Sequence, residues 1–162
     1  MAEIISKLTH TNLVEIGAKY LFGRGYMVVL KELTTCIPET PDVLGFRSGH
    51  SYLLEAKTSR GDFKADAKKS FRRYPPQGVG SYRSYVCPKG LIKPEELPAG
   101  WGLVYIDPIT KRPRTIKHPT YQAPNIANEQ LLLVSVVRRM IDGFEYKKYL
   151  HRVPEGDTND MQ

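Results

Sequence analysis

The chain has 162 residues, 41% of them hydrophobic and 25% charged, which is typical of one ordinary globular domain and excludes wholesale disorder. The longest apolar run, at 131–134, is too short to span a bilayer, and the N-terminal MAEIISKLTH lacks the apolar stretch of a signal peptide. Two cysteines are too few for a disulfide framework or for four ligands to a zinc or iron–sulfur site. These features together predict a reduced, cytoplasmic protein that does not enter a membrane. The net charge of +7 favours a polyanionic partner.

Hydrophobic periodicity and turn residues predict alternating helices and strands. The expected elements, in chain order, are a helix over 11–22 capped by Thr11, strands over 26–33, 41–47 and 51–58, a helix over 62–73 capped by Ser59, a strand over 81–87, a helical turn over 93–97, a strand over 101–107, a Pro-rich basic loop over 108–124, and a closing helix over 128–142 that ends at Gly143. This order predicts an α/β fold with a central mixed sheet flanked by helices. We expect one domain over 1–152 and a polar, flexible tail over 153–162.

The second and third expected strands are separated by a Ser-Gly pair at 48–49, which suits a tight hairpin turn. If the strands pair across this turn, Asp42 lies opposite Glu55. The Cβ atoms of such a pair are about 4.5–5.5 Å apart. Lys57 follows Glu55 by two residues and would point to the same face. The register therefore predicts two carboxylates and one ammonium group at one end of a hairpin.

Opposed carboxylates raise one another's pKa, and a sequence tolerates them most readily when a cation lies between them. Carboxylate oxygens that leave a coordination shell incomplete suit Mg²⁺, which keeps waters and shares the phosphate oxygens of a substrate. Lys57 would then orient a water molecule or offset charge on the phosphorus. The alternative is a solvent-facing pair in which Lys57 is an ordinary salt-bridge partner of Glu55. Apolar residues on both faces of the two strands favour the metal site.

The same residues resemble a known family. Pro41-Asp42 followed by Glu55-Ala56-Lys57 matches the PD-(D/E)XK pattern of the restriction-endonuclease-like nuclease superfamily, and the expected order α-β-β-β-α-β is similar to its common core. The resemblance implies a Mg²⁺-dependent nuclease, with Mn²⁺ able to substitute, that hydrolyses DNA phosphodiester bonds. It also implies that Asp42, Glu55 and the Ala56 carbonyl hold the metal ion and that Lys57 assists the nucleophilic water.

The resemblance covers residues 11–107. The run from 59 to 107 also resembles small bacterial and phage nuclease-like proteins, some linked to DNA repair, which implies a bacterial or phage-infected cell. A Glu from the first helix often completes such sites, and Glu15 stands at the matching position. Its alternative role is an i, i+4 pair with Lys19 on an exposed helix face.

Seven basic and only two acidic residues lie between positions 57 and 73. Cations that contact phosphates dominate affinity for nucleic acid. We therefore expect five side chains of this segment to bind nucleic acid, namely Arg60, Lys64, Lys68, Lys69 and Arg72. Three of them form a stripe at i, i+4, i+8 in a continuous helix. The alternative is a solvated helix face.

Two other functions stay open. The first is a catalytically silent nucleic-acid-binding or regulatory protein, because a fold does not dictate an activity. The second is an RNA-directed nuclease, because no feature of the sequence indicates whether the site accepts or excludes a 2′-hydroxyl group. A homodimer formed through the apolar face of the closing helix would suit cleavage of both strands of a duplex; otherwise that face covers the sheet. The sequence does not separate endonuclease from exonuclease action, or duplex from single-stranded or branched DNA.

Overall fold

Short runs of β-branched and aromatic residues between glycine and proline turns build the strands of this protein. The computed structural model describes residues 7–142 and 149–151. Its elements are α1 (His10–Gly23), β1 (Val28–Lys31), β2 (Val43–Arg47), β3 (His50–Ala56), α2 (Arg60–Asp66), α3 (Ser70–Arg73), the 3₁₀ turn η1 (Pro75–Gln77), β4 (Tyr82–Pro88), the 3₁₀ turn η2 (Pro94–Glu96), β5 (Trp101–Ile106), β6 (Pro113–Lys117), α4 (Ile126–Ile141) and β7 (Tyr149–His151).

The described strands form one mixed sheet in the order β6-β5-β4-β3-β2-β1-β7. The neighbours β1–β2 and β2–β3 are antiparallel, β3–β4 and β4–β5 are parallel, and β6 and β7 pair antiparallel with β5 and β1. This arrangement confirms the predicted α/β fold with a mixed sheet. It also places the segment containing α2 and α3 in the crossover between the parallel strands β3 and β4. No helix in the described part of the chain has the length and apolar character needed to cross a membrane.

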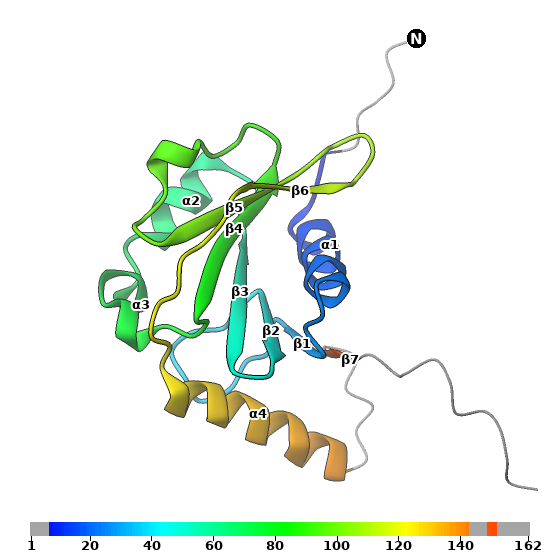
Figure 1. Cartoon of the computed structure of the whole chain (residues 1–162), viewed down its shortest axis with the longest axis vertical. Helices are drawn as coiled ribbons and strands as arrows, with labels where there is room; N and C mark the ends of the chain where they lie inside the picture. Colours follow the sequence, from blue (N-terminus) through cyan, green and yellow to red (C-terminus); the bar gives the residue numbers. More distant parts are fainter. Residues whose placement is uncertain (1–6, 143–148, 152–162) are drawn as a thin grey trace, which may run out of the picture.

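The sheet has a separate apolar core on each face, because successive side chains along a strand point to opposite sides. On one face α1 packs against Val43 and Leu54. On the other face Leu132 of α4 belongs to a core with Leu44 and Leu53. In Figure 1, α1 lies beside the sheet and α4 crosses the end where the β2–β3 hairpin turns. The two helices therefore cover opposite faces and leave the other end of the hairpin near α2.

The first helix begins earlier than expected. Thr9, and not Thr11, is its N-cap: the Thr9 hydroxyl accepts a hydrogen bond from the Asn12 N–H (3.2 Å), and the Asn12 side chain accepts one from the Thr9 N–H (3.1 Å). This reciprocal cap satisfies two backbone donors that a helix start leaves unpaired. His10 is consequently the first residue of α1.

The expected continuous helix over 62–73 is wrong. The chain forms α2 and α3 with a break between them, where Lys69 has an extended backbone. In a continuous helix six residues advance the direction of a side chain by about 600°, so Asp66 and Arg72 would point to different sides. Asp66 is the last residue of α2, and the break turns Arg72 toward it, so that Arg72 Nε donates to Asp66 Oδ2 over 2.8 Å.

The segment over 108–124 is not entirely a loop, because β6 pairs with β5 across a register irregularity at Leu103–Val104. Most residues of β6 are exposed. The strand starts with Pro113 and carries basic side chains, both of which edge strands tolerate. This polar, proline-containing edge lacks the hydrophobic alternation from which a strand is predicted.

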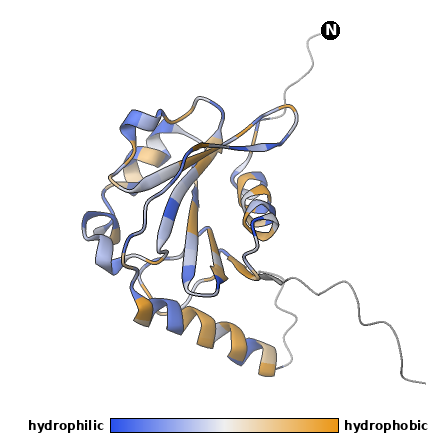
Figure 2. Ribbon diagram, viewed as in Figure 1, coloured by the Kyte–Doolittle hydropathy of each residue, from blue (hydrophilic) through white to orange (hydrophobic). Residues whose placement is uncertain are grey.

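The closing helix α4 is capped by Asn125 and is anchored through Glu129, whose Oε1 accepts hydrogen bonds from Ser51 Oγ (2.6 Å) and the Gly80 N–H (2.8 Å). In Figure 2 α4 alternates between apolar and polar turns, and four of its apolar side chains are exposed, namely Leu131, Val134, Val137 and Met140. The homodimer stays a prediction. The expected stop at Gly143 and the tail over 153–162 lie outside the described residues.

Candidate functional site

The β2–β3 hairpin has the predicted register. Its pairs run without a shift from Val43 opposite Leu54 to Arg47 opposite His50 at the turn. The ladder ends at the first of these pairs, one residue short of Asp42 and Glu55. Pro41 has no N–H with which to continue the pairing. The two carboxylates therefore lie at the open end of the hairpin, opposite its turn, although β3 continues to pair with β4 there.

Asp42 replaces the missing backbone acceptor with its own side chain, since its Oδ2 accepts a hydrogen bond from the Ala56 N–H over 2.8 Å. Burial, which has the largest effect, and the charge of Glu55 together raise the pKa of Asp42 to about 7, against the lowering effects of the Ala56 N–H and Lys57. The effect of Glu55 on this pKa indicates that the two carboxylates share one electrostatic environment. The raised pKa shows that this environment disfavours the charged form of Asp42, which a bound cation would stabilise.

This raised pKa predicts a pH-dependent stability in the absence of divalent ions. The folded protein keeps a proton on Asp42 up to about pH 7, whereas the unfolded chain releases it near 3.8. The contribution of Asp42 to the free energy of unfolding is therefore fully present below pH 3.8 and is lost as the pH rises through about 7. We expect Asp42→Asn to be more stable than the parent at about pH 8, with a smaller gain at about pH 5. Urea unfolding in EDTA at both pH values measures this, and an equal gain at both would contradict the shift.

Glu55 is almost completely buried between two cations. Its Oε2 lies 3.4 Å from Lys57 Nζ, and its Oε1 lies 3.1 Å from Arg72 Nη2. The contact with Arg72 lacks hydrogen-bond geometry. Glu55 Oε1 and Arg72 Nη2 are therefore both buried without a hydrogen bond. A buried carboxylate oxygen in this state has unused capacity to accept a donor or a cation, and leaving it unused costs free energy.

The Lys57 ammonium lies beside Glu55, as the strand register predicts. It is also 3.4 Å from Asp66 Oδ1 and 3.9 Å from Asp62 Oδ1. Burial lowers the pKa of Lys57, but the charges of Glu55, Asp66 and Asp42 outweigh burial and leave the pKa raised. Lys57 is therefore protonated at neutral pH and acts as a fixed positive charge, not as a general base.

Behind this pair, further side chains complete a buried group of charges. Arg72 is 3% exposed and pairs with Glu39 and Asp66. Glu39 Oε2 also accepts a hydrogen bond from the Val79 N–H (2.9 Å), and the Tyr85 hydroxyl donates to Asp66 Oδ2 (2.8 Å). We call this group the buried ionic network, and its members are Glu39, Glu55, Lys57, Asp66 and Arg72.

The network holds three carboxylates and two cations, so the cations are shared. Burial raises the pKa of Asp66, but Arg72 and Lys57 outweigh burial and hold it below its usual range. Burial has the largest effect on Glu39 and raises its pKa. Arg72 lowers this pKa and the charge of Glu55 raises it, and the pKa stays above its usual value. The crossover between β3 and β4 supplies Asp66 and Arg72, and so fixes the positions of both Glu55 and Lys57.

The structure divides the five basic residues that were predicted to contact DNA. Lys64 and Lys68 are exposed. Arg60 is engaged by Glu96, which accepts hydrogen bonds from both of its Nη atoms. Lys69 is half-exposed, and its Nζ lies 2.9 Å from Asp66 Oδ1.

The fifth residue does not belong to this surface. The predicted stripe of Lys64, Lys68 and Arg72 is wrong, because the break between α2 and α3 turns Arg72 into the buried ionic network. A guanidinium group that is 3% exposed is not available to a phosphate. The candidate nucleic-acid contacts on this segment are therefore the exposed lysines.

The structure does not bring Glu15 into the site. Its Oε1 pairs with Lys31 Nζ over 2.7 Å, so its partner is neither the metal shell nor Lys19. A different residue of α1 reaches Asp42: His10 Nε2 lies 3.5 Å from Asp42 Oδ1 and 3.2 Å from Glu32 Oε1.

Four charged or titratable residues near the site do not follow from the sequence pattern, namely His10, Glu32, Glu39 and Asp66. Glu39 lies between two expected strands, where no periodicity fixes the direction of a side chain. His10 fell outside a helix that was expected to begin one residue later. Glu32 was placed inside a strand that in fact ends at Lys31, and its φ of 47° turns the chain there. Asp66 lies three residues after Phe63, so helical spacing allows an inward position, but a carboxylate is rarely buried without a partner, and no cation that would pair with it follows from the sequence pattern.

Comparison with known proteins identifies the fold and no activity. No family model and no curated protein matches this chain. Among solved structures, the SPO1766 protein of unknown function from Silicibacter pomeroyi is similar, with a TM-score of 0.61 and 22% sequence identity over 86% of this chain and 98% of that chain. The two proteins share a fold.

Proposed function

We propose that this protein is a metal-dependent nuclease that hydrolyses DNA phosphodiester bonds, with Mg²⁺ as its ion. The observation that carries the proposal is the grouping of Asp42, Glu55 and Lys57 at the open end of the β2–β3 hairpin. The raised pKa of Asp42 and the 3.4 Å contact between Lys57 and Glu55 both support one shared site.

The residues present fit a divalent ion. Carboxylate oxygens are the ligands that Mg²⁺ prefers, and Glu55 Oε1 is buried without a hydrogen bond. Asp42 and Glu55 would hold the ion, together with the Ala56 carbonyl that the family resemblance suggests. A bound Mg²⁺ would acidify a water molecule and polarise the phosphate.

The side chains of the protein have their own parts in this scheme. The Ala56 N–H donates to Oδ2 of Asp42 and thereby fixes the orientation of this carboxylate. Lys57, held by Asp66, places a positive charge beside Glu55, where it would stabilise negative charge that develops on the phosphate. The exposed Lys64 and Lys68 would contact the DNA backbone beyond the cut.

The test is a cleavage assay on single-stranded, duplex and branched DNA and on an RNA of matched sequence, with Mg²⁺, with Mn²⁺ and with EDTA. We expect cleavage of DNA that needs a divalent ion. Asp42→Asn, purified in parallel, controls for contaminating nuclease and should be inactive. Equal product from the parent and from this variant, or cleavage in EDTA, would contradict the proposal.

A second candidate is a nucleic-acid-binding protein without turnover. The observation in its favour is that Glu55 is 3% exposed and has both oxygens next to cations, so Lys57 and Arg72 already neutralise it. Binding of DNA without products in either metal ion would support this second function. Cleavage of only the matched RNA would instead identify an RNA-directed nuclease.

A further inference from the structure

We infer that His10, Glu32 and Asp42 form a second cation site, which takes a transition-metal dication such as Mn²⁺ or Zn²⁺. One ligand atom from each residue lies within 4.8 Å of the other two. His10 Nε2 is 3.2 Å from Glu32 Oε1 and 3.5 Å from Asp42 Oδ1. Ligand atoms bound tetrahedrally at about 2.1 Å from one ion lie about 3.4 Å from each other. The two shorter separations therefore already match those of a coordination sphere.

Backbone contacts hold the three side chains in place. The Thr9–Asn12 cap fixes the start of α1 and with it His10. The Glu32 N–H donates to the Asp42 carbonyl over 3.0 Å, which clamps the two acidic residues side by side at the ends of β1 and β2. Three separate elements thus converge without a rearrangement, and such preorganisation favours binding.

Asp42 offers a different oxygen to each side. Its Oδ2 is engaged by the Ala56 N–H, and its Oδ1 is the atom next to His10. The site therefore adjoins the Asp42–Glu55 pair and shares Asp42 with it, but it needs neither Glu55 nor Lys57. It stands whether or not the protein is a nuclease.

The donor set determines the class of metal ion. One imidazole nitrogen with two carboxylate oxygens suits Zn²⁺, Mn²⁺ and related ions, whereas Mg²⁺ prefers oxygen donors alone. The side chains of His10 and Glu32 are 41% and 45% exposed, so water can fill the remaining positions and the ion can exchange. Asp42 is 17% exposed and forms the inner wall.

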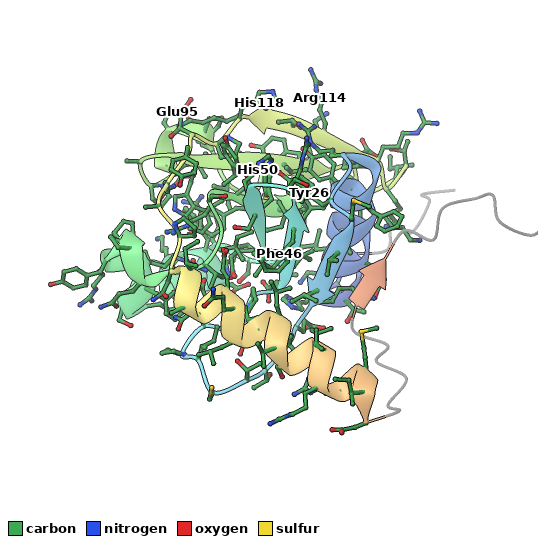
Figure 3. All side chains as sticks on the ribbon, turned by 60° about the horizontal axis from the view of Figure 1, so that its bottom comes forward. Tyr26, Phe46, His50, Glu95, Arg114 and His118 are labelled. Carbon is green, nitrogen blue, oxygen red and sulfur yellow. The ribbon has the colours of Figure 1, made fainter. Side chains whose placement is uncertain are left out.

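The experiment counts Mn²⁺ ions bound by the tag-free, full-length protein, by electron paramagnetic resonance of free Mn²⁺. The variants are His10→Gln, Glu32→Gln and Glu55→Gln. Matched controls are His118→Gln and Glu95→Gln, two exposed residues that are both labelled at the upper edge of the view in Figure 3. Melting curves check that each variant is folded. We expect His10→Gln and Glu32→Gln to fold, because both side chains are exposed.

We expect His10→Gln and Glu32→Gln to weaken one Mn²⁺ site by at least about tenfold, while both controls bind as the parent does. In Glu55→Gln that site should persist, and Zn²⁺ should displace Mn²⁺ from it at lower concentration than Mg²⁺ does. Unchanged Mn²⁺ binding in both His10→Gln and Glu32→Gln overturns this inference.

The same titration separates this inference from the proposed function. Loss of Mn²⁺ in Glu55→Gln alone would leave the nuclease metal site standing and remove the second site. Loss only in His10→Gln and Glu32→Gln would support the second site and count against metal binding by the Asp42–Glu55 pair.

Discussion

Replacing Glu55 with glutamine is expected to lower Mg²⁺-dependent cleavage of DNA by at least about a hundredfold, because it removes a charge that the proposed reaction needs. The amide has nearly the same shape but cannot supply the buried anionic oxygen that makes no hydrogen bond in this structure. Initial rates on a saturating duplex substrate measure the effect.

The change is expected to leave the fold intact. Without the Glu55 charge, Lys57 keeps Asp66, and Arg72 keeps both Glu39 and Asp66. The two cations of the buried ionic network would then face two carboxylates. Thermal melting should therefore place Glu55→Gln close to the parent. A folded Glu55→Gln protein that cuts at the parental rate would refute the assignment of this residue.

Arg72→Met should lower the free energy of unfolding by about 3–5 kcal/mol, because it leaves buried carboxylates without their shared cation. Glu39 depends on Arg72 most, since its other contact is the Val79 N–H. Asp66 retains Lys57 and the Tyr85 hydroxyl. Urea unfolding measures the loss, which should appear as a lower midpoint with an unchanged slope.

The loss should depend on pH in a defined direction. Arg72 lowers the pKa of Glu39, so its removal would raise that pKa further above its usual value. A raised carboxyl pKa contributes stability at low pH that is lost as the pH rises, so Arg72→Met should be more damaging at about pH 8 than at about pH 5. The neighbouring, exposed Arg73 provides the control, and Arg73→Met should change stability by less than about 0.5 kcal/mol. Equal effects of the two changes would show that the network does not carry this stability.

The hairpin was predictable because its register follows from arithmetic alone. The turn at 48–49 and the period of two along a strand fix which residues face each other, and both rules are local. That is why Lys57 lies beside Glu55 as expected. The same rules could not show that the ladder ends before Asp42, because that depends on the competition between the Asp42 side chain and a backbone carbonyl for the Ala56 N–H.

The remainder of the site depends on contacts between residues far apart in the chain. In the sequence, Arg72 has the spacing of a surface cation on a helix. Only the path of the crossover brings it next to Glu39 and Glu55. His10 and Glu32 belong to elements separated by a strand and a turn, and their approach to Asp42 follows from how the ends of α1, β1 and β2 align. Local propensity contains no information of this kind.

The placement of Asp66 and Arg72 on the crossover between β3 and β4 has a consequence for the order in which the molecule assembles. The hairpin can form early, since its contacts are close in sequence. It then presents Glu55 and Lys57 to water until the crossover docks, because enclosing charged groups before their partners arrive is costly. Docking of the crossover should therefore both complete the sheet and exclude bulk water from Glu55 and Lys57. Partly folded molecules would then lack a functional site.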